Sequence, residues 1–296
     1  MNVFPLPKPD TTTIGETQVR WGERTLVMGV INTTADSFSG DGLDYQVDAA
    51  VAQGLRFVEE GADILDVGGE STRPTYSANV ETCLRGVSSK AGSRVTEEDE
   101  LRRIIPVIEQ LAKITTVPIS VDTYKHAVAR HALESGASLL NDVWGAEIDS
   151  NLATIAAEYG VPIVLMHNQL GTYYDGDIVD IVVATLAQIR DAAVDTGVPR
   201  ENIILDPGFG FGKTVEGNLE ILRRLDDFRC LGQPLLLGTS RKSTIGMVLN
   251  TPTQERLEGT AATTAIGIAR GVDIVRVHDV RFMARVARMS DSISRK

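Results

Sequence analysis

The sequence predicts a single-domain (β/α)8 TIM barrel, and three observations support this fold class. Short apolar runs alternate with helical patterns along almost the whole chain, which is typical of βαβ units and a parallel sheet. Eight such runs fit within 296 residues, a length that suits one closed barrel. Several runs also end in a polar residue, as barrel strands do where they reach an active site. A doubly wound open sheet is the alternative architecture.

The eight expected strands are short and apolar, so each is expected to be buried on both faces. They span residues 25–33, 62–68, 118–123, 138–143, 162–166, 202–206, 234–238 and 273–277. Five apolar runs end in polar residues, which are Asn32, Asp122, Asn141, Asp206 and the pair Arg276 and His278. A buried carboxylate, amide or cation costs several kcal/mol unless it is hydrogen-bonded or paired. The simplest arrangement therefore gathers these ends around one polar pocket at the C-terminal rim.

Helices and loops complete the expected single domain, which covers residues 1–296. Thr96 and Asp99 form a box-like cap before the apolar face of one helix. Glycines at the ends of other helical runs are C-cap candidates: Gly61, Gly136, Gly160, Gly197 and Gly271. Residues 1–24 are expected to form an N-terminal extension or lid. The longest irregular connection, 74–95, follows the second strand and has a length that is usually functional.

Composition limits the classes of function. The net charge of -11 argues against non-specific nucleic-acid binding. The two cysteines, Cys83 and Cys230, lie far apart, which favours neither a disulfide framework nor a zinc site and suits the cytoplasm. We expect no signal peptide in residues 1–24 and no membrane span, because no uncharged apolar run approaches the roughly 20 residues that a span needs.

Five segments at the predicted strand ends resemble motifs of the dihydropteroate synthase family, and they occur in the family's order. They are residues 29–39 (GVINTTADSFS), 66–74 (DVGGESTRP), 206–213 (DPGFGFGK), 240–243 (SRKS) and 276–278 (RVH). The resemblance covers residues 25 to 285 and implies a TIM barrel that is commonly a homodimer. It also implies a transferase of folate synthesis, the family inhibited by sulfonamides. Such an enzyme joins 6-hydroxymethyl-7,8-dihydropterin diphosphate to 4-aminobenzoate and releases pyrophosphate.

The resemblance implies a pterin pocket built from strand ends and the loops that follow them. Its residues would be Asp122, Asn141, Met166, Asp206, Phe211 and Lys242. Carboxylates suit the N–H donors of a pterin, because charge-assisted hydrogen bonds are worth about 1.5–3 kcal/mol each. A competing interpretation of Asp122 is that it caps a helix starting near Tyr124.

The diphosphate would be held, by the same resemblance, by Asn32, Thr72, Arg73, Arg276 and His278, with Mg2+ on Asn32. Arginine grips phosphate oxygens with parallel bonds, and an amide oxygen with substrate oxygens and water suits magnesium. Two alternatives stay open. Arg276 would otherwise form an ion pair with Asp279 or Asp66, and His278 would otherwise be a satisfied neutral histidine.

The 4-aminobenzoate ring would lie between Phe38, Pro74 and Phe211, with its carboxylate at Ser243 and the helix that begins there. An exposed Arg-Lys pair at residues 241–242 is otherwise a common solvated feature. Residues 206–214 also invite comparison with a phosphate-binding loop, but Gly208 and Gly212 enclose three residues where the nucleotide motif needs four. A nucleotide triphosphatase is therefore not expected.

The implied reaction is dissociative and needs no covalent intermediate, with Asp122, Asp206, Lys242, Arg276 and His278 as its catalytic residues. The chain departs from the family at Ala35, where proline is usual, and at Asp41, which is displaced by one position. The loop after strand two is longer than usual by roughly fifteen residues. A pterin-dependent methyltransferase and a non-catalytic pterin-binding protein are the competing functions.

Overall fold

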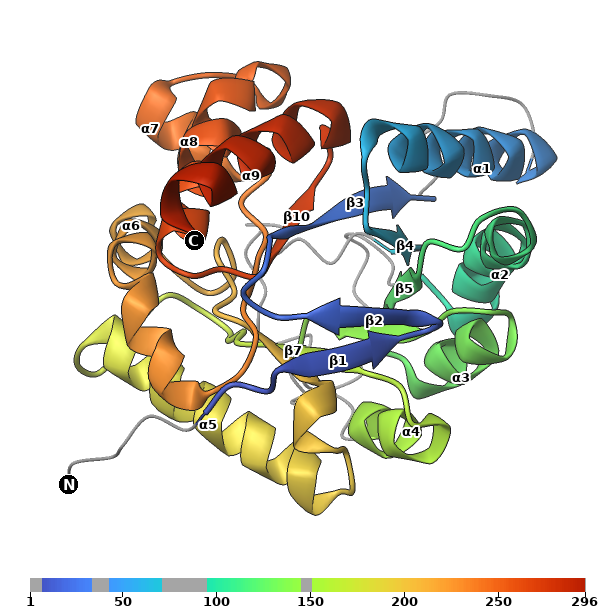
Figure 1. Cartoon of the computed structure of the whole chain (residues 1–296), viewed down its shortest axis with the longest axis horizontal. Helices are drawn as coiled ribbons and strands as arrows, with labels where there is room; N and C mark the ends of the chain where they lie inside the picture. The colour runs from blue at the N-terminus through green and yellow to red at the C-terminus, as the bar shows by residue number, and fades with distance from the viewer. Residues whose placement is uncertain (1–6, 34–42, 71–94, 145–150, 296) are drawn as a thin grey trace.

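The computed structural model describes residues 7–33, 43–70, 95–144 and 151–295. Its main sheet has eight parallel strands in the order β8-β7-β6-β5-β4-β3-β10-β9, surrounded by helices (Figure 1). The strands are β3 (Leu26–Asn32), β4 (Ile64–Gly68), β5 (Ile119–Asp122), β6 (Leu139–Asp142), β7 (Ile163–Met166), β8 (Ile203–Asp206), β9 (Leu236–Leu237) and β10 (Ile274–Val277). A parallel bridge between Leu205 and Leu235 joins β8 to the residues before β9 and nearly closes the barrel. The fold class and all eight strand positions are confirmed.

The helices follow the strands as expected. They are α1 (Leu43–Glu60), α2 (Glu97–Ile114), α3 (His126–Glu134), α4 (Asn151–Tyr159), α5 (Ile178–Asp195), α6 (Val215–Arg223), α7 (Ser243–Leu249), α8 (Leu257–Ala269) and α9 (Val280–Ser294). Thr96 caps α2 by accepting a bond from the Asp99 amide at 3.1 Å. All five predicted C-cap glycines have positive φ angles. None of the helices in the described part of the chain has the length and hydrophobicity that a membrane span needs.

A hairpin within the N-terminal extension lies across one end of the barrel (Figure 1). Its strands are β1 (Thr11–Ile14) and β2 (Thr17–Arg20). Ile14 and Val19 pack in one cluster with residues that start the barrel strands, including Leu26 and Ile274. The hairpin therefore closes the N-terminal end of the barrel. The expectation of a lid is corrected for these residues, because they lie at the end opposite the rim where the site was predicted.

Strand alternation determines which side chains enter the barrel. Met28, Ile64, Leu139, Val164, Ile204 and Ile274 pack with the hairpin at the barrel's lower level. Two residues further along each strand, the inward positions hold Val30, Asp66, Asn141, Met166, Asp206 and Arg276. The alternate residues of β4, Leu65 and Val67, point outward and join the core between the sheet and the helices. The barrel thus has an apolar lower layer and a largely polar upper one.

Candidate active site

Arg276 joins two buried aspartates in the upper layer. Its Nε donates to Asp66 Oδ2 and its Nη2 to Asp122 Oδ2, each at 2.6 Å. Of the two ion pairs considered as alternatives for Arg276, the pair with Asp66 is therefore present, whereas Asp279 pairs with Arg241 instead. The helix-cap interpretation of Asp122 is wrong, because α3 begins after Lys125 and has no side-chain cap. Asp122 is available to a ligand in the barrel mouth.

Both aspartates keep one unused oxygen. Oδ1 of Asp66 and Oδ1 of Asp122 are buried and have no hydrogen-bond partner among the described residues. Asn141 donates from Nδ2 to Asp66 Oδ2 at 3.1 Å, which brings the predicted amide into the same group. Burial raises the pKa of Asp122, and the charge of Arg276 opposes that rise. Buried acceptors without partners are costly, so the cluster is suited to a ligand that supplies N–H donors.

The third carboxylate, Asp206, lies at the end of β8 beside a loop that carries aromatic residues. Its Oδ1 accepts a bond from the Gly208 amide at 2.7 Å. Burial raises the pKa of Asp206, while the charge of Lys242 lowers it. Lys242 donates to the Phe209 carbonyl, and its ammonium lies 4.4 Å from the centre of the Phe211 ring.

Met166 and Phe211 form an apolar wall next to these charges. They pack in one small cluster with Val143, and Trp144 lies against it. Met166 pairs with Asp206 across β7 and β8, so the wall and the carboxylate belong to neighbouring strand ends. A flat, polar-edged ligand matches this combination of an apolar face with charged groups at its edge.

Lys213 was not among the predicted site residues, yet it fixes the loop that carries Phe211. Its Nζ lies 3.0 Å from each of three atoms: His167 Nδ1, the Gly208 carbonyl oxygen and the Phe211 carbonyl oxygen. Burial lowers the pKa of Lys213 to about 7 and the pKa of His167 to about 3. The lysine is directed at its own loop, unlike the lysine of a nucleotide-binding loop, so the exclusion of that motif agrees with the geometry. The sequence feature that could have identified Lys213 is its position in a segment rich in glycine and phenylalanine.

Gly208 is required by this loop. Its φ is +70°, and a Cβ added there would lie 1.8 Å from the His167 carbonyl oxygen. Gly208 also gives its amide to Asp206 and its carbonyl oxygen to Lys213. One residue thus links the carboxylate to the buried lysine.

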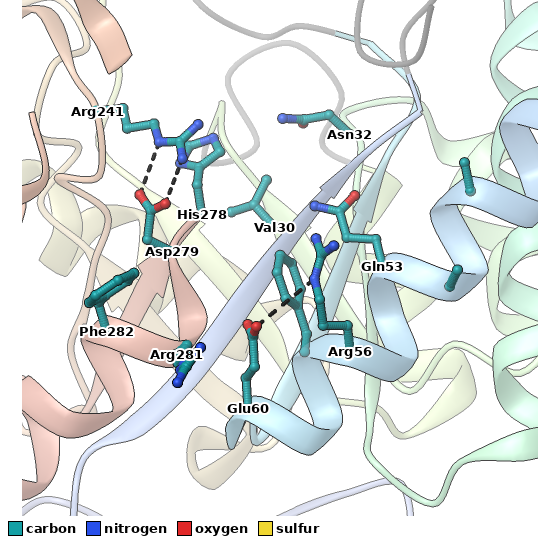
Figure 2. A pocket seen from close by; sticks show the side chains of 13 residues that line it. Val30, Asn32, Gln53, Arg56, Glu60, Arg241, His278, Asp279, Arg281 and Phe282 are labelled. Carbon is teal, nitrogen blue, oxygen red and sulfur yellow. Dashed lines mark hydrogen bonds and ion pairs between the residues drawn. The ribbon is translucent and has the colours of Figure 1, made fainter. Parts of the chain in front are cut away.

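The remaining predicted cation, His278, is held by the loop after β9. Both its amide and its Nδ1 lie close to Ser240 Oγ, at 3.1 and 3.0 Å. Asn32, at the end of β3, lines the same cavity as His278 (Figure 2). This cavity has a volume of about 870 Å³ and runs from the barrel mouth outward between α1 and α9. Ser243, the first residue of α7, is exposed.

Arg241 adopts an unusual conformation between Ser240 and Lys242. Its φ is 58°, in the left-handed region that disfavours residues other than glycine. The guanidinium binds Asp279 through two bonds of 3.0 and 2.6 Å (Figure 2), and the carbonyl oxygen accepts from Arg256 at 2.9 Å. These bonds hold the loop in a strained shape while connecting it to the segment that follows His278.

Several predicted residues lie outside the described part of the chain. Among the site residues these are Phe38, Thr72, Arg73 and Pro74. Ala35, Asp41 and nearly all of the 74–95 loop also lie there. The described residues therefore bring together Asp122, Asn141, Met166, Asp206, Phe211, Lys242 and Arg276, with Asn32 and His278 lining the adjoining cavity.

Comparison with known proteins identifies the family. A family model described as "Pterin binding enzyme" matches residues 28–278. Dihydropteroate synthase from Clostridium beijerinckii is 47% identical, and the match covers 96% of this chain and 99% of that relative. The chain belongs to the dihydropteroate synthase family.

Solved structures of dihydropteroate synthases have the same fold. One from Clostridium difficile, obtained in the presence of pteroic acid, has a TM-score of 0.86 at 47% identity and covers 93% of this chain and 99% of its own. Another, from Xanthomonas albilineans with 4-aminobenzoic acid, has a TM-score of 0.86 at 37% identity and covers 96% of this chain and 98% of its own. Dihydropteroate synthase membership thus rests on both sequence and fold across nearly the full chain.

Proposed function

We propose that this chain condenses 6-hydroxymethyl-7,8-dihydropterin diphosphate with 4-aminobenzoate to form 7,8-dihydropteroate and pyrophosphate. The observation that carries the proposal is the unpartnered, buried Oδ1 of Asp122, within a cluster that also holds Asp66, Asn141 and Arg276. Such an acceptor calls for a ligand N–H donor, and the edge of a pterin has several. Family membership supports the same reaction.

In this mechanism Asp122 and Asp206 accept hydrogen bonds from the pterin, and Asn141 forms a further hydrogen bond to the edge of the ring. Lys242 donates to the ring carbonyl or a ring nitrogen from above Phe211. Met166 and Phe211, which pack in one apolar cluster, lie against the ring. The bound heterocycle is thereby fixed in one orientation, with its reactive methylene directed toward the cations of the rim.

In this proposal Arg276 binds the diphosphate while it forms ion pairs with both aspartates. Its two ion pairs use Nε and Nη2, and Nη1 has no partner among the described residues. Nη1 therefore offers two N–H donors to a phosphate oxygen while the pairs with Asp66 and Asp122 persist. The presence of an ion pair and a role in diphosphate binding are thus compatible. His278 adds a further donor beside it.

Magnesium would be held mainly by the substrate. Among the described residues, no group of three or more His, Cys, Asp or Glu side chains could hold a metal ion. Asn32 faces the cavity and its side chain forms no hydrogen bond in the described part of the chain, so its amide oxygen is available (Figure 2). One amide oxygen with diphosphate oxygens and water is a donor set that magnesium accepts. When bound, the ion would neutralise charge on the diphosphate.

The chemical step we propose is dissociative. The bond between the pterin methylene and the diphosphate oxygen breaks first, and pyrophosphate leaves with the electron pair. The neutral amine of 4-aminobenzoate then attacks the methylene and loses a proton. Asp122 and Asp206 stabilise the cationic pterin through its N–H groups, while Arg276 and His278 stabilise the departing oxygens. Phe38, Pro74 and Ser243, together with Phe211, are proposed to position 4-aminobenzoate, and Thr72 and Arg73 to assist with the diphosphate.

A homodimer is proposed from the surface of three adjacent helices. Exposed apolar side chains gather on α7, α8 and α9, which lie side by side (Figure 1). They are Met247, Val248, Leu249, Ile266, Met289 and Ile293. Patches of this kind mark interfaces more often than solvated surface. Light scattering of the purified chain tests the assembly. The cytoplasmic location stays a prediction.

One assay tests the proposed function. Purified protein is mixed with dihydropterin diphosphate, 4-aminobenzoate and magnesium chloride, and both pyrophosphate and dihydropteroate are measured. We expect the two products in equal amounts, and no dihydropteroate when 4-aminobenzoate is omitted. Pterin binding without turnover would instead indicate a carrier, and methyl transfer to a corrinoid protein would indicate a methyltransferase.

A further inference from the structure

The cavity at His278 extends well beyond the residues assigned to the reaction. Its inner end is lined by Asn32 and His278, and its outer part runs between α1 and α9 (Figure 2). None of its lining residues belongs to the proposed pterin pocket. The cavity therefore leads from the proposed diphosphate position to solvent without passing the pterin.

The outer part of this cavity carries arginines from both helices. Arg56 projects from α1 and Arg281 from α9 (Figure 2). Among the described residues, Arg56 has a loose ion pair with Glu60, at 3.9 Å, and its guanidinium lies 5.8 Å from the centre of the Phe57 ring. Arg281 is exposed and forms no ion pair with any described residue. Two cations on facing helices are thus available to a ligand between them.

The charge of the cavity differs from that of the whole chain. Its lining has three arginines (Arg56, Arg241 and Arg281) and two carboxylates (Glu60 and Asp279), which leaves one positive charge before His278 is counted. The chain as a whole has a net charge of -11. Phe57 and Phe282 also line the cavity, and apolar walls strengthen the interaction of an anion with nearby cations. This local positive balance favours an anionic ligand in the cavity, against the negative charge of the whole chain.

We infer that the outer cavity is an anion subsite that receives pyrophosphate after it leaves the pterin, with Arg56 and Arg281 as its ligands. This inference rests on the proposed function, because pyrophosphate is the anion that the reaction forms next to Asn32 and His278. The subsite takes inorganic diphosphate as a free polyanion, and no covalent step occurs there. Its position gives the leaving group an exit that is separate from the pterin pocket.

The ordinary interpretation of two exposed arginines is that they are solvated charges without a ligand. A matched control separates the two interpretations. Arg285 lies one turn further along α9, is also exposed, forms no ion pair with a described residue and does not line the cavity. Its replacement removes the same charge from the same helix. A general electrostatic effect would therefore be equal for Arg281 and Arg285.

The test is the affinity of the full chain for sodium pyrophosphate, measured by calorimetry. We expect Arg281→Gln and Arg56→Gln each to weaken binding about three- to tenfold, the effect of one charged contact with an anion. Arg285→Gln is expected to bind like the wild type. Equal affinity of Arg281→Gln, Arg56→Gln and Arg285→Gln would overturn the subsite.

The binding readout does not depend on turnover. If the wild type forms no dihydropteroate, the proposed function fails, while the affinities still report on the subsite. If the wild type is active, inhibition by added pyrophosphate provides a second measurement. Arg281→Gln should then raise the inhibition constant by a factor similar to that for binding, and an unchanged constant would count against the subsite.

Discussion

Replacement of Asp122 by asparagine tests the recognition of the pterin most specifically. In the wild type, Asp122 Oδ2 accepts from Arg276 at 2.6 Å, and Oδ1 is buried without a partner in the part of the chain that the structure describes. Asparagine retains one acceptor for Arg276 but presents an NH2 group where the pterin would need an oxygen. The loss of one charge-assisted bond is worth about 1.5–3 kcal/mol, which corresponds to about a 10- to 150-fold decrease in kcat/KM.

The stability of the Asp122→Asn variant should not follow its activity. Burial raises the pKa of Asp122, so the folded state favours the protonated form over the carboxylate. Above the ordinary pKa of an aspartate, the group therefore lowers the stability of the fold, and it does so fully once the pH exceeds its raised pKa. Asparagine removes this cost. We expect a melting temperature at pH 8 that is equal to or above that of the wild type.

Asp273 provides the matched control. It is also buried and paired with a cation, Lys8, at 2.7 Å, and it accepts a bond from the Leu235 amide. It lies at the start of β10, at the other end of the barrel from Asp122. Asp273→Asn should lower the melting temperature and leave kcat/KM within about twofold. If it reduces kcat/KM as strongly as Asp122→Asn, or if Asp122→Asn retains full activity, the assignment of Asp122 is wrong.

Three further perturbations address other parts of the site. Asp206→Asn should lose about 2–4 kcal/mol of transition-state stabilisation, measured as kcat/KM, and wild-type kcat/KM would contradict its role. Asp279→Asn removes one of the two acceptors that hold Arg241, together with the charge of the pair, and should lower kcat/KM about tenfold by loosening the loop. Asp226→Asn, which breaks a 2.7 Å ion pair away from the site, is its control, and equal losses would exclude a positioning role. His167 has a pKa lowered to about 3, so the unfolded chain binds a proton that the folded chain does not between pH 6.5 and 3. The free energy of unfolding should therefore fall as pH decreases through this window. Urea denaturation at several pH values should show a weaker pH dependence of this free energy for His167→Asn than for the wild type. An equal pH dependence of the two proteins would refute this role of His167.

The strands and the inward side chains were predictable because both follow from short-range patterns. An apolar run that ends in a carboxylate or amide identifies Asp122, Asn141 and Asp206 without knowledge of the rest of the chain. The period of two along a strand then places these residues on the same face as the apolar residues below them. The closed barrel brings the ends together, so the pocket follows from the fold class.

The partners of Arg276 were not predictable in the same way. Asp279 is three residues away in sequence, while Asp66 and Asp122 are 210 and 154 residues away. The choice depends on β10 lying next to β3, with β4 and β5 beyond it, in a register that places these side chains at one level. Without this register, Asp66 and Asp279 are both possible partners of Arg276.

Two other features depend on contacts that no local pattern records. Lys213 is buried because its ammonium group satisfies carbonyl oxygens of a loop whose turns need Gly208. The N-terminal hairpin had a local signal, a threonine-rich run followed by Gly15 in a tight turn. Its place at the N-terminal end of the barrel depends on the packing of Ile14 and Val19 against the starts of the barrel strands, which the local sequence does not show.

A crystal structure of the full chain with bound pteroic acid tests the central claim most directly. Our account predicts pterin N–H donors about 2.7–3.0 Å from Asp122 Oδ1 and from the Asp206 carboxylate, with the ring against Met166 and Phe211. A pterin that lies beyond hydrogen-bonding distance of both carboxylates, in crystals of protein that is active in solution, would contradict it.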